Sequence, residues 1–290
     1  MNLAGLHTRT TVIFDSGLAA DEVRIGRLLQ SGPAGERVSH HLDHIRRLAG
    51  LESSVYVESE SNFPVGAGLA SSASAFAALT LAACAAADLS PSERELSALA
   101  RLGSGSAARS VPGGYVEWQA ADRHDESYAY SIAPPEHWAL IDLVAIVSRA
   151  PKATGSTGGH ALAPTSPLHS ARLAGAGDRL ALCRDSLMAR DFSALAEVVE
   201  ADSTLMHAVM MTSRPPLYYW QPLTLAIMAA VREWRAGGLS VCFTIDAGPN
   251  VHCICEAPAA GEIERRLRAM PGVLDVLRAE PGGPARLVDP

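Results

Sequence analysis

The spacing of hydrophobic residues along the chain changes repeatedly between the period of a strand and that of a helix. Val55 and Val57 alternate with more polar residues over 54–59, which predicts a half-buried strand. Within 37–48 the apolar residues recur every three or four positions and stop at Gly50, which predicts an amphipathic helix. Similar reasoning predicts further strands at 10–14, 113–120, 127–132, 139–147, 240–246, 251–256 and 273–279, and further helices at 73–87, 93–102, 170–190, 193–211, 222–236 and 260–269.

These elements divide most naturally near residue 150. Residues 151–167 are rich in Gly, Ser, Thr and Pro, a composition typical of a linker. We therefore expect an N-terminal lobe at 1–150 and a C-terminal lobe at 151–290. In the second lobe a helical block is followed by two strands, a helix and a last strand, which is typical of an α+β, ferredoxin-like sandwich.

Composition narrows the class of protein. The chain has 290 residues with 24 Lys+Arg against 31 Asp+Glu, a net charge of −7, and no basic block, so we expect no nucleic-acid partner. Hydrophobic residues make up 48% and charged residues 19%, as in a globular enzyme with small-molecule substrates. The five cysteines form no CxxC pair, and the N-terminus carries no secretory pattern. We expect a cytoplasmic protein with reduced thiols and no membrane association.

The segment from Asn62 to Ala73 contains closely spaced glycines and two adjacent serines between a strand and a helix. Backbone N–H groups in such a loop can surround an anion without obstruction by Cβ atoms, and the helix dipole adds a favourable field. No Gly-Lys-Ser/Thr follows, so this is not the usual P-loop. The alternative is a glycine-rich turn that caps an alanine-rich helix.

Two further segments carry candidate chemistry. Residues 103–110 place three hydroxyls and the guanidinium of Arg109 on a glycine-containing turn, which suits an oxyanion or a carboxylate. In 244–250 a β-branched run stops at Asp246 before a Gly-Pro turn, where a carboxylate could orient or deprotonate a hydroxyl. The alternatives are a polar interhelical loop and an Asp that opens an ordinary turn. Three histidines at 40, 41 and 44 lack a partner acid at metal-ligand spacing and fit a solvated helix face better than a metal site.

Taken together, the three segments resemble one enzyme family. PVGAGLASSASA matches the ATP loop of the GHMP small-molecule kinase superfamily at every fixed position of Pro-x3-Gly-Leu-x-Ser-Ser-Ala. GSGSAARS(x3)GGYVEW and DAGPN are similar to stretches of its branch of mevalonate diphosphate and phosphomevalonate decarboxylases. Supporting similarity runs from TRTTVIFD through LMH at 205–207 to RPPLYYW at 214–220.

This resemblance implies a two-lobed α+β GHMP kinase fold, with an N-terminal lobe like domain 2 of ribosomal protein S5. It implies ATP-dependent decarboxylation of (R)-5-diphosphomevalonate to isopentenyl diphosphate, with Mg²⁺ held mainly through the ATP phosphates, in a homodimer. By position, the catalytic residues are Asp246 and Arg109. The substrate-binding residues are Arg37, Ser104, Gly105, Ser106, Ala107, Ala108, Arg109 and Thr157. The ATP-binding residues are Asn62, Gly66, Ala67, Gly68, Leu69, Ser71 and Ser72.

The chain also departs from the family pattern. It opens at what looks like the family's second strand, without the Lys-Tyr-Trp-Gly-Lys-like segment, so we expect an internal start codon, a truncated gene or a replacement for that strand. Gly155 stands where the first serine of a phosphate-binding Ser-Ser-Thr segment is usual, and Thr157 leaves the monophosphate open as an alternative substrate. Two other functions stay open: a kinase that does not decarboxylate, and a noncatalytic nucleotide-binding remnant.

Overall fold

The computed structural model of the chain describes residues 1–64, 71–150 and 154–288. It forms two compact units. The first combines Met1–Pro64 and Ala70–His137 with Pro281–Pro290, and the second includes Trp138–Glu280. The expected lobe boundaries, 1–150 and 151–290, stay a prediction. Within the described ranges, no helix is both long and apolar enough to cross a membrane.

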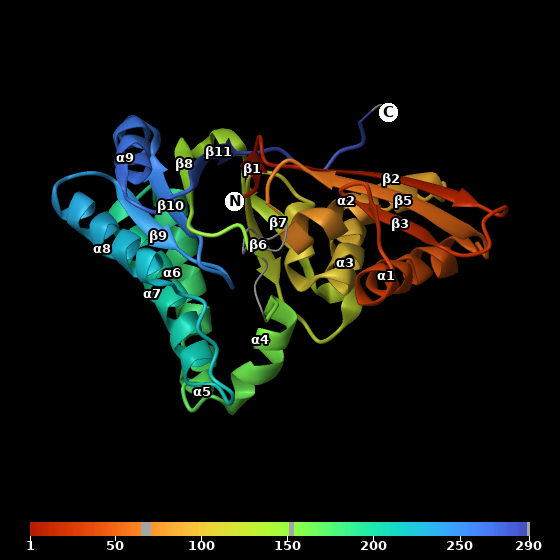
Figure 1. The fold of residues 1–290 in the computed structure, drawn as a ribbon, viewed down its shortest axis with the longest axis horizontal. Coiled ribbons are helices and arrows are strands. Elements are labelled where there is room, and N and C mark those ends of the chain that lie inside the picture. The colour runs from red at the N-terminus through yellow and green to blue at the C-terminus, as the bar shows by residue number, and fades with distance from the viewer. Residues whose placement is uncertain (65–70, 151–153, 289–290) are drawn as a thin grey trace. The chain divides into compact units, whose positions relative to one another are not determined.

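The first unit combines a sheet, a hairpin and three helices (Figure 1). The sheet order is β2-β5-β3-β4, and β6 and β7, which correspond to the strands predicted at 113–120 and 127–132, pair as an antiparallel hairpin. The strands are β1 (Leu3–Ala4), β2 (Thr8–Asp15), β3 (Glu22–Ile25), β4 (Leu28–Leu29), β5 (Ser54–Ser61), β6 (Tyr115–Gln119) and β7 (Tyr128–Ala133). The helices are α1 (Pro33–Ala49), α2 (Ser71–Ala86) and α3 (Glu93–Gly103), with 3-10 turns η1 (Gly105–Ser110), η2 (His124–Glu126) and η3 (Pro135–His137).

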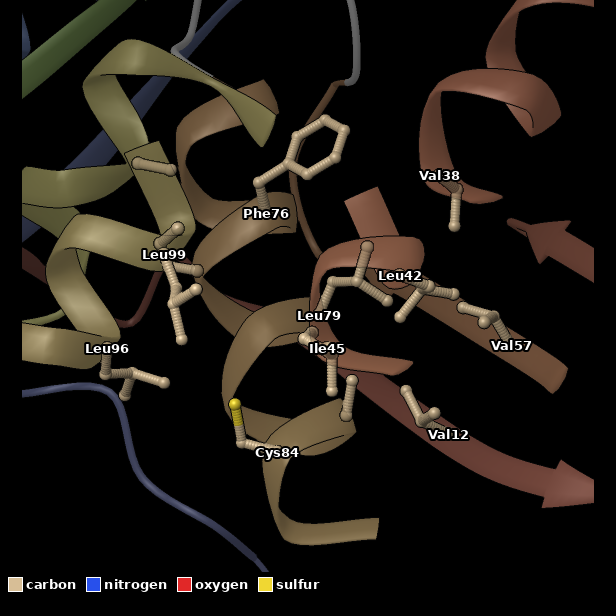
Figure 2. Close-up of a cluster of buried hydrophobic side chains, with 14 of the residues drawn as sticks. Val12, Val38, Leu42, Ile45, Val57, Phe76, Leu79, Cys84, Leu96 and Leu99 are labelled. Atoms are coloured by element: carbon tan, nitrogen blue, oxygen red, sulfur yellow. The ribbon is translucent and has the colours of Figure 1, made fainter. Parts of the chain in front are cut away.

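Alternation in the strands and periodicity in the helices produce one core in this unit. Val55 and Val57 of β5 are buried while their sequence neighbours are partly exposed, so one face of the sheet receives the helices. Figure 2 shows Leu42 and Ile45 of α1 near Val57, with side chains of α2 and α3 in the same cluster, to which Val55 also belongs. The predicted strand at 54–59 and helix at 37–48 are therefore confirmed.

Local capping explains where two helices begin and end. Ser92 caps α3, because its hydroxyl accepts the Glu95 N–H and the Glu95 carboxylate accepts the Ser92 N–H, a complete capping box. Gly50 ends α1 in the left-handed conformation with φ of 66°, which a residue with a Cβ adopts only at a cost. Both boundaries lie where the sequence predicts them.

The second unit is an antiparallel sheet with helices (Figure 1). Its strands β8 (Leu140–Ile146), β9 (Val241–Thr244), β10 (Val251–Glu256) and β11 (Asp275–Pro281) have the order β11-β8-β10-β9. Its helices are α4 (Ser156–Leu162), α5 (His169–Ala174), α6 (Ala176–Ala189), α7 (Phe192–Met211), α8 (Pro222–Ala236) and α9 (Ala257–Ala269), with a 3-10 turn η4 (Ala163–Thr165). In chain order the strands lie 4-1-3-2 and all adjacent pairs are antiparallel, which is the predicted ferredoxin-like arrangement.

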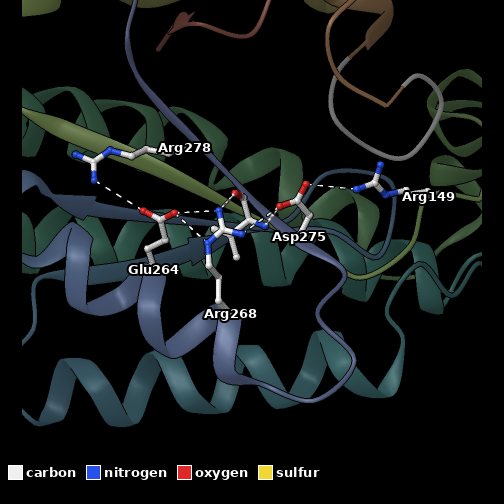
Figure 3. A network of polar contacts seen from close by, with 6 residues as sticks. Arg149, Glu264, Arg268, Asp275 and Arg278 are labelled. Atoms are coloured by element: carbon white, nitrogen blue, oxygen red, sulfur yellow. Dashed lines mark hydrogen bonds and ion pairs between the residues drawn. The ribbon is translucent and has the colours of Figure 1, made fainter.

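Burial explains why β8 is central. All seven of its residues are buried, as the almost continuous apolar run at 139–147 predicts for a central strand. Ile227 and Val231 of α8 and Ile263 and Leu267 of α9 pack against one face of the sheet. Asp275, at the start of β11, pairs with Arg149 and with Arg268 of α9 (Figure 3).

The linker prediction for 151–167 is wrong over the described residues 154–167, which contain α4 and η4. Small residues are needed here for packing rather than for flexibility. A Cβ at Gly159 would lie 2.9 Å from the Tyr219 hydroxyl oxygen and 3.3 Å from the Met210 sulfur. The single helix predicted at 170–190 is also wrong, because Gly175 separates α5 from α6. Residues 151–153 lie outside the described residues.

A buried ion pair joins β8 to β10 next to the turn at 246–250. His252 Nδ1 lies 2.8 Å from Asp142 Oδ2, and both side chains are buried. Burial alone would lower the pKa of His252, but the Asp142 charge and hydrogen bond, helped by the charge of Asp246, raise it to about 9. The imidazole is therefore cationic at neutral pH.

This pair makes stability depend on alkaline pH. A histidine with a pKa of about 9 in the folded state and about 6.5 when unfolded adds stability that is complete below pH 6.5 and is lost as pH rises through 9. We predict that wild type loses on the order of 2–3 kcal/mol more unfolding free energy between pH 7 and 10 than His252→Gln does. Urea unfolding across that range measures it. The exposed His40→Gln is the control and should follow wild type; equal slopes for wild type and His252→Gln would contradict the assignment.

Candidate active site

The serine loop, defined as Ser104–Arg109, carries most of the predicted substrate residues. It begins at the C-cap of α3 and continues into η1, a 3-10 turn that the sequence indicates only as a glycine-containing turn. Ala107 and Ala108 are fully buried, so the loop is anchored by its apolar residues while its polar ones lie outside. Buried Ser97 of α3 donates to the Ala108 carbonyl at 2.9 Å and accepts the Ala129 N–H at 2.8 Å. The backbone of the loop is thus attached to both α3 and β7.

Hydroxyls from two segments meet at this loop. Ser72, in the first turn of α2, lies with its Oγ 3.2 Å from Ser104 Oγ, which in turn lies 3.4 Å from Ser106 Oγ. The first turn of α2 holds no acidic side chain, so its N-terminal N–H groups and these hydroxyls make a favourable environment for an anion. Ser71 precedes Ser72 at the helix start. The predicted nucleotide serines and substrate serines are therefore brought together.

The serine loop carries one arginine, Arg109, and a second arginine, Arg37, contacts the residue before it. The exposed Arg109 guanidinium carbon lies 5.9 Å from the centre of the Trp118 ring on β6, which holds the side chain by a cation–π contact. Arg37, on α1, donates through Nε and Nη2 to the Gly103 carbonyl at 3.2 and 2.6 Å. Partial burial lowers the pKa of Arg37. One cation thus lies within the serine loop and a second contacts the residue that precedes it.

Of the other residues predicted to bind ATP, the structure describes Asn62 alone. Asn62, at the end of β5, accepts the His7 N–H at 2.9 Å and donates to the Gly5 carbonyl at 2.6 Å, so its amide fastens the chain's first residues. Gly66, Ala67, Gly68 and Leu69 lie outside the described residues.

In the second unit, Asp246 lies in the acid turn, defined as Asp246–Asn250, directly after the end of β9. Its side chain is exposed, whereas Ile245 before it and Gly248, Pro249 and Asn250 after it are buried. The Asn250 amide oxygen accepts the N–H groups of Val147 and Ser148 at 2.7 and 3.0 Å, which joins the turn to the end of β8. The carboxylate is thus carried on a rigid backbone.

Helix α7 holds the other side of the acid turn. Ser203 accepts the Ile245 N–H at 3.0 Å and donates to its carbonyl at 3.3 Å, and His207 Nε2 donates to the same carbonyl at 3.1 Å. Burial lowers the pKa of His207 to about 4, with the hydrogen bond and the charge of Asp246 acting in the opposite direction. His207 is therefore neutral at pH 7 and serves as a hydrogen-bond donor. The sequence signal for this pair is the i,i+4 spacing of Ser203 and His207, which places both on one face of α7.

Thr157 is exposed near the start of α4. This helix continues into Ala163, which shares a small apolar cluster with Val209, Met210 and Tyr219, against which Ala247 of the acid turn also packs. Thr157 and Asp246 are therefore attached to one supporting cluster. Among residues 1–64, 71–150 and 154–288, no group of three His, Cys, Asp or Glu side chains could hold a metal ion.

Comparison with known proteins relates these features to one family. Residues 1–129 match the family domain described as diphosphomevalonate decarboxylase-like N-terminal domain, and residues 142–275 match the mevalonate 5-diphosphate decarboxylase C-terminal domain. The diphosphomevalonate decarboxylase of Ganoderma lucidum is 41% identical over 208 residues, which cover 68% of this chain and 52% of that enzyme. The chain therefore spans about half the length of the curated relatives it matches first.

Two further relatives match over almost the whole chain. The phosphomevalonate decarboxylase of Haloferax volcanii is 34% identical over 284 residues, or 98% of this chain and 86% of that protein. The solved mevalonate diphosphate decarboxylase from Enterococcus faecalis, described for its mevalonate diphosphate mediated ATP binding mechanism, superposes with a TM-score of 0.87 at 33% identity, covering 96% and 86% of the two chains. These matches confirm the predicted fold class.

Proposed function

The chain belongs to the diphosphomevalonate decarboxylase family, and we propose that it catalyses the ATP-dependent decarboxylation of (R)-5-diphosphomevalonate to isopentenyl diphosphate, ADP, phosphate and CO₂. The observation that carries this proposal is the acid turn: an exposed carboxylate at Asp246 on a backbone held by α7 and β8. Fixed placement of a carboxylate is what activation of a hindered tertiary hydroxyl requires, because positioning matters more there than basicity.

The serine loop supplies groups that suit the acid substrate. Arg109 carries the planar fork that pairs with a carboxylate through two N–H groups. Ser104 and Ser106 offer hydroxyls, and Arg37 offers a second guanidinium for the substrate phosphates. Gly105 lies beside the Trp118 ring, which a Cβ there would meet at an ordinary contact distance of 3.4 Å. Thr157 is assigned to the same phosphates by the family resemblance.

ATP is the co-substrate in this proposal. Ser71 and Ser72 at the start of α2, with no acidic residue in that turn, suit its phosphates. Mg²⁺, when bound, neutralises charge on the nucleotide and is held mainly through the ATP phosphates. Asn62 and the residues from Gly66 to Leu69 complete the nucleotide loop by resemblance.

Asp246 acts in both stages of the proposed reaction. Its carboxylate accepts a hydrogen bond from the 3-hydroxyl and orients that oxygen for attack on the γ-phosphate. Attack on the γ-phosphorus breaks its bond to ADP, and the hydroxyl proton passes to solvent. The new 3-phosphate group then leaves as inorganic phosphate with the electron pair of its C–O bond, and the bond to the carboxyl group breaks to release CO₂ and supply the electrons of the double bond. Positive charge that develops near C3 is stabilised by the Asp246 carboxylate, while Arg109 keeps the departing carboxylate aligned.

A homodimer in the cytoplasm also belongs to this proposal. Cys84, Cys242, Cys253 and Cys255 are buried thiols outside any disulfide, as expected in a reducing compartment. Leu173 on α5 and Leu180 and Leu182 on α6 are exposed, so these helices offer apolar side chains for contact with a second copy.

A second candidate is phosphomevalonate decarboxylation, which yields isopentenyl phosphate. It is favoured by the match to the Haloferax volcanii protein over 98% of this chain. The two candidates differ in the number of substrate phosphates and not in the chemistry at Asp246.

Substrate preference distinguishes these candidates. We predict a higher kcat/KM for the diphosphate than for the monophosphate, because the additional phosphate gives Arg37 and the serines more charge to bind. Steady-state assays of the full chain with both acids measure this ratio. A tenfold or greater preference for the monophosphate, a difference of about 1.4 kcal/mol, would contradict the first candidate and support the second.

Replacement of Asp246 tests the mechanism. Asp246→Asn keeps the shape and removes the charge, so we predict that kcat falls by about 10²–10³, on the order of 3–4 kcal/mol, with little change in KM. Arg109→Lys should lower kcat and raise KM for the acid because the fork is lost. The exposed Asp178→Asn of the same unit serves as the control and should retain full activity. If Asp246→Asn retained more than about a tenth of wild-type kcat, Asp246 would have only a structural role in the turn and its catalytic assignment would be wrong.

A further inference from the structure

Phe76 of α2 occupies the space that a side chain at Gly103 would need. A Cβ built on Gly103 would lie 2.1 Å from Phe76 Cδ1 and 2.7 Å from two other ring atoms. An aromatic ring cannot bend away as the end of a flexible chain can, so glycine at 103 allows the ring to lie directly against the backbone. Gly103 is the residue immediately before the serine loop.

Arg37 lies over the other part of the same ring. Its guanidinium carbon is 4.7 Å from the Phe76 ring centre, within the range of a cation–π contact. The same guanidinium donates twice to the Gly103 carbonyl. Phe76 therefore supports both a predicted phosphate ligand and the backbone that leads into Ser104.

His41 fixes the ring from behind. The Thr80 hydroxyl donates its only proton to the Phe76 carbonyl at 2.5 Å, so it can only accept from His41 Nε2, 2.8 Å away. The imidazole thus carries its proton on Nε2, and it meets the Phe76 ring edge to face at 5.2 Å. Burial, together with the positive charges of His44 and Arg37, lowers the pKa of His41 to about 4. A neutral imidazole here leaves Arg37 as the cation on this ring.

We propose that Phe76, fixed by His41, is a positioning residue for the substrate phosphates: its ring sets the position of the Arg37 guanidinium, and through it the two hydrogen bonds to the Gly103 carbonyl. This inference rests on the proposed function, because it assigns Arg37 and the serines to an anionic phosphorylated acid. The contact with Arg37 distinguishes Phe76 from the other buried residues of α2 named below. Leu79 and Cys84 lie in the same cluster, farther along the helix (Figure 2), and contribute to the core alone.

The test combines Phe76→Leu, which removes the ring, with Arg37→Gln and the double variant, all in the full chain. Phe76→Met is made in parallel, because its flexible chain fills the space if Leu leaves a cavity. Leu79→Val is the matched control, since it alters the same helix and core without touching Arg37. Circular dichroism and thermal unfolding verify that each variant folds. The measured quantities are KM for each mevalonate phosphate, KM for ATP, kcat, and Kd for inorganic diphosphate by titration calorimetry.

We expect Phe76→Leu to raise KM for the phosphorylated acid and Kd for diphosphate by about three- to tenfold, as loss of a cation–π contact implies. KM for ATP and kcat should stay within about twofold. In the Arg37→Gln background the same change should have no further effect on kcat/KM, because the ring acts through Arg37. A purely structural role would lower thermal stability equally in both backgrounds and leave these binding constants unchanged.

Three results would overturn the proposal: unchanged KM and Kd in Phe76→Leu and Phe76→Met, an equal loss in the Arg37→Gln background, or an equal rise in KM in Leu79→Val. Absence of turnover by wild type with either acid would instead contradict the proposed function. The positioning role of Phe76 would then be tested by comparing Kd for diphosphate between wild type and the Phe76 variants. Wild type that does not bind diphosphate would contradict the positioning role itself.

Discussion

Buried side chains satisfy the backbone of the acid turn, and this leaves its carboxylate exposed on a fixed frame. A buried N–H or carbonyl without a partner costs as much as a lost hydrogen bond, so a sharp turn at the end of a buried strand needs polar partners. Ser203 and His207 supply them for Ile245, and Asn250 supplies them for the end of β8. The serine loop follows the same principle, with Ser97 beneath it.

Three histidines differ in charge at neutral pH because their surroundings differ. Burial lowers the pKa of His41 and of His207 to about 4, so both are neutral donors that fix a hydroxyl and a carbonyl. His252 is also buried, but Asp142 raises its pKa to about 9 and makes it a cation within the sheet. A neighbouring carboxylate therefore decides the charge of a buried imidazole, and no sequence pattern places Asp142 and His252 together before the register of β8 and β10 is known.

Elements with local determinants were predictable from the sequence. The Ser92 capping box, the glycine stop at Gly50 and the apolar run of β8 each depend on neighbouring residues, and each lies where predicted. Composition predicts a linker at 154–167, but the segment contains a helix. Gly159 is required there by its close contact with Tyr219, which is 60 positions away in the sequence. Phe76 was missed for the same reason: its contact with Gly103 crosses from α2 to α3. Predicted site residues such as Ser72 and Ser104 came from motifs, whereas their support came from tertiary packing.

In the proposed mechanism, phosphoryl transfer and decarboxylation are coupled at one carboxylate, that of Asp246. The most direct measurement follows ADP and CO₂ released together by the full chain acting on (R)-5-diphosphomevalonate, with the carboxyl carbon isotopically labelled. If the two steps are coupled, one CO₂ is released for each ADP throughout the time course. Steady formation of ADP with a stable phosphorylated acid and no CO₂ would contradict it and identify a kinase.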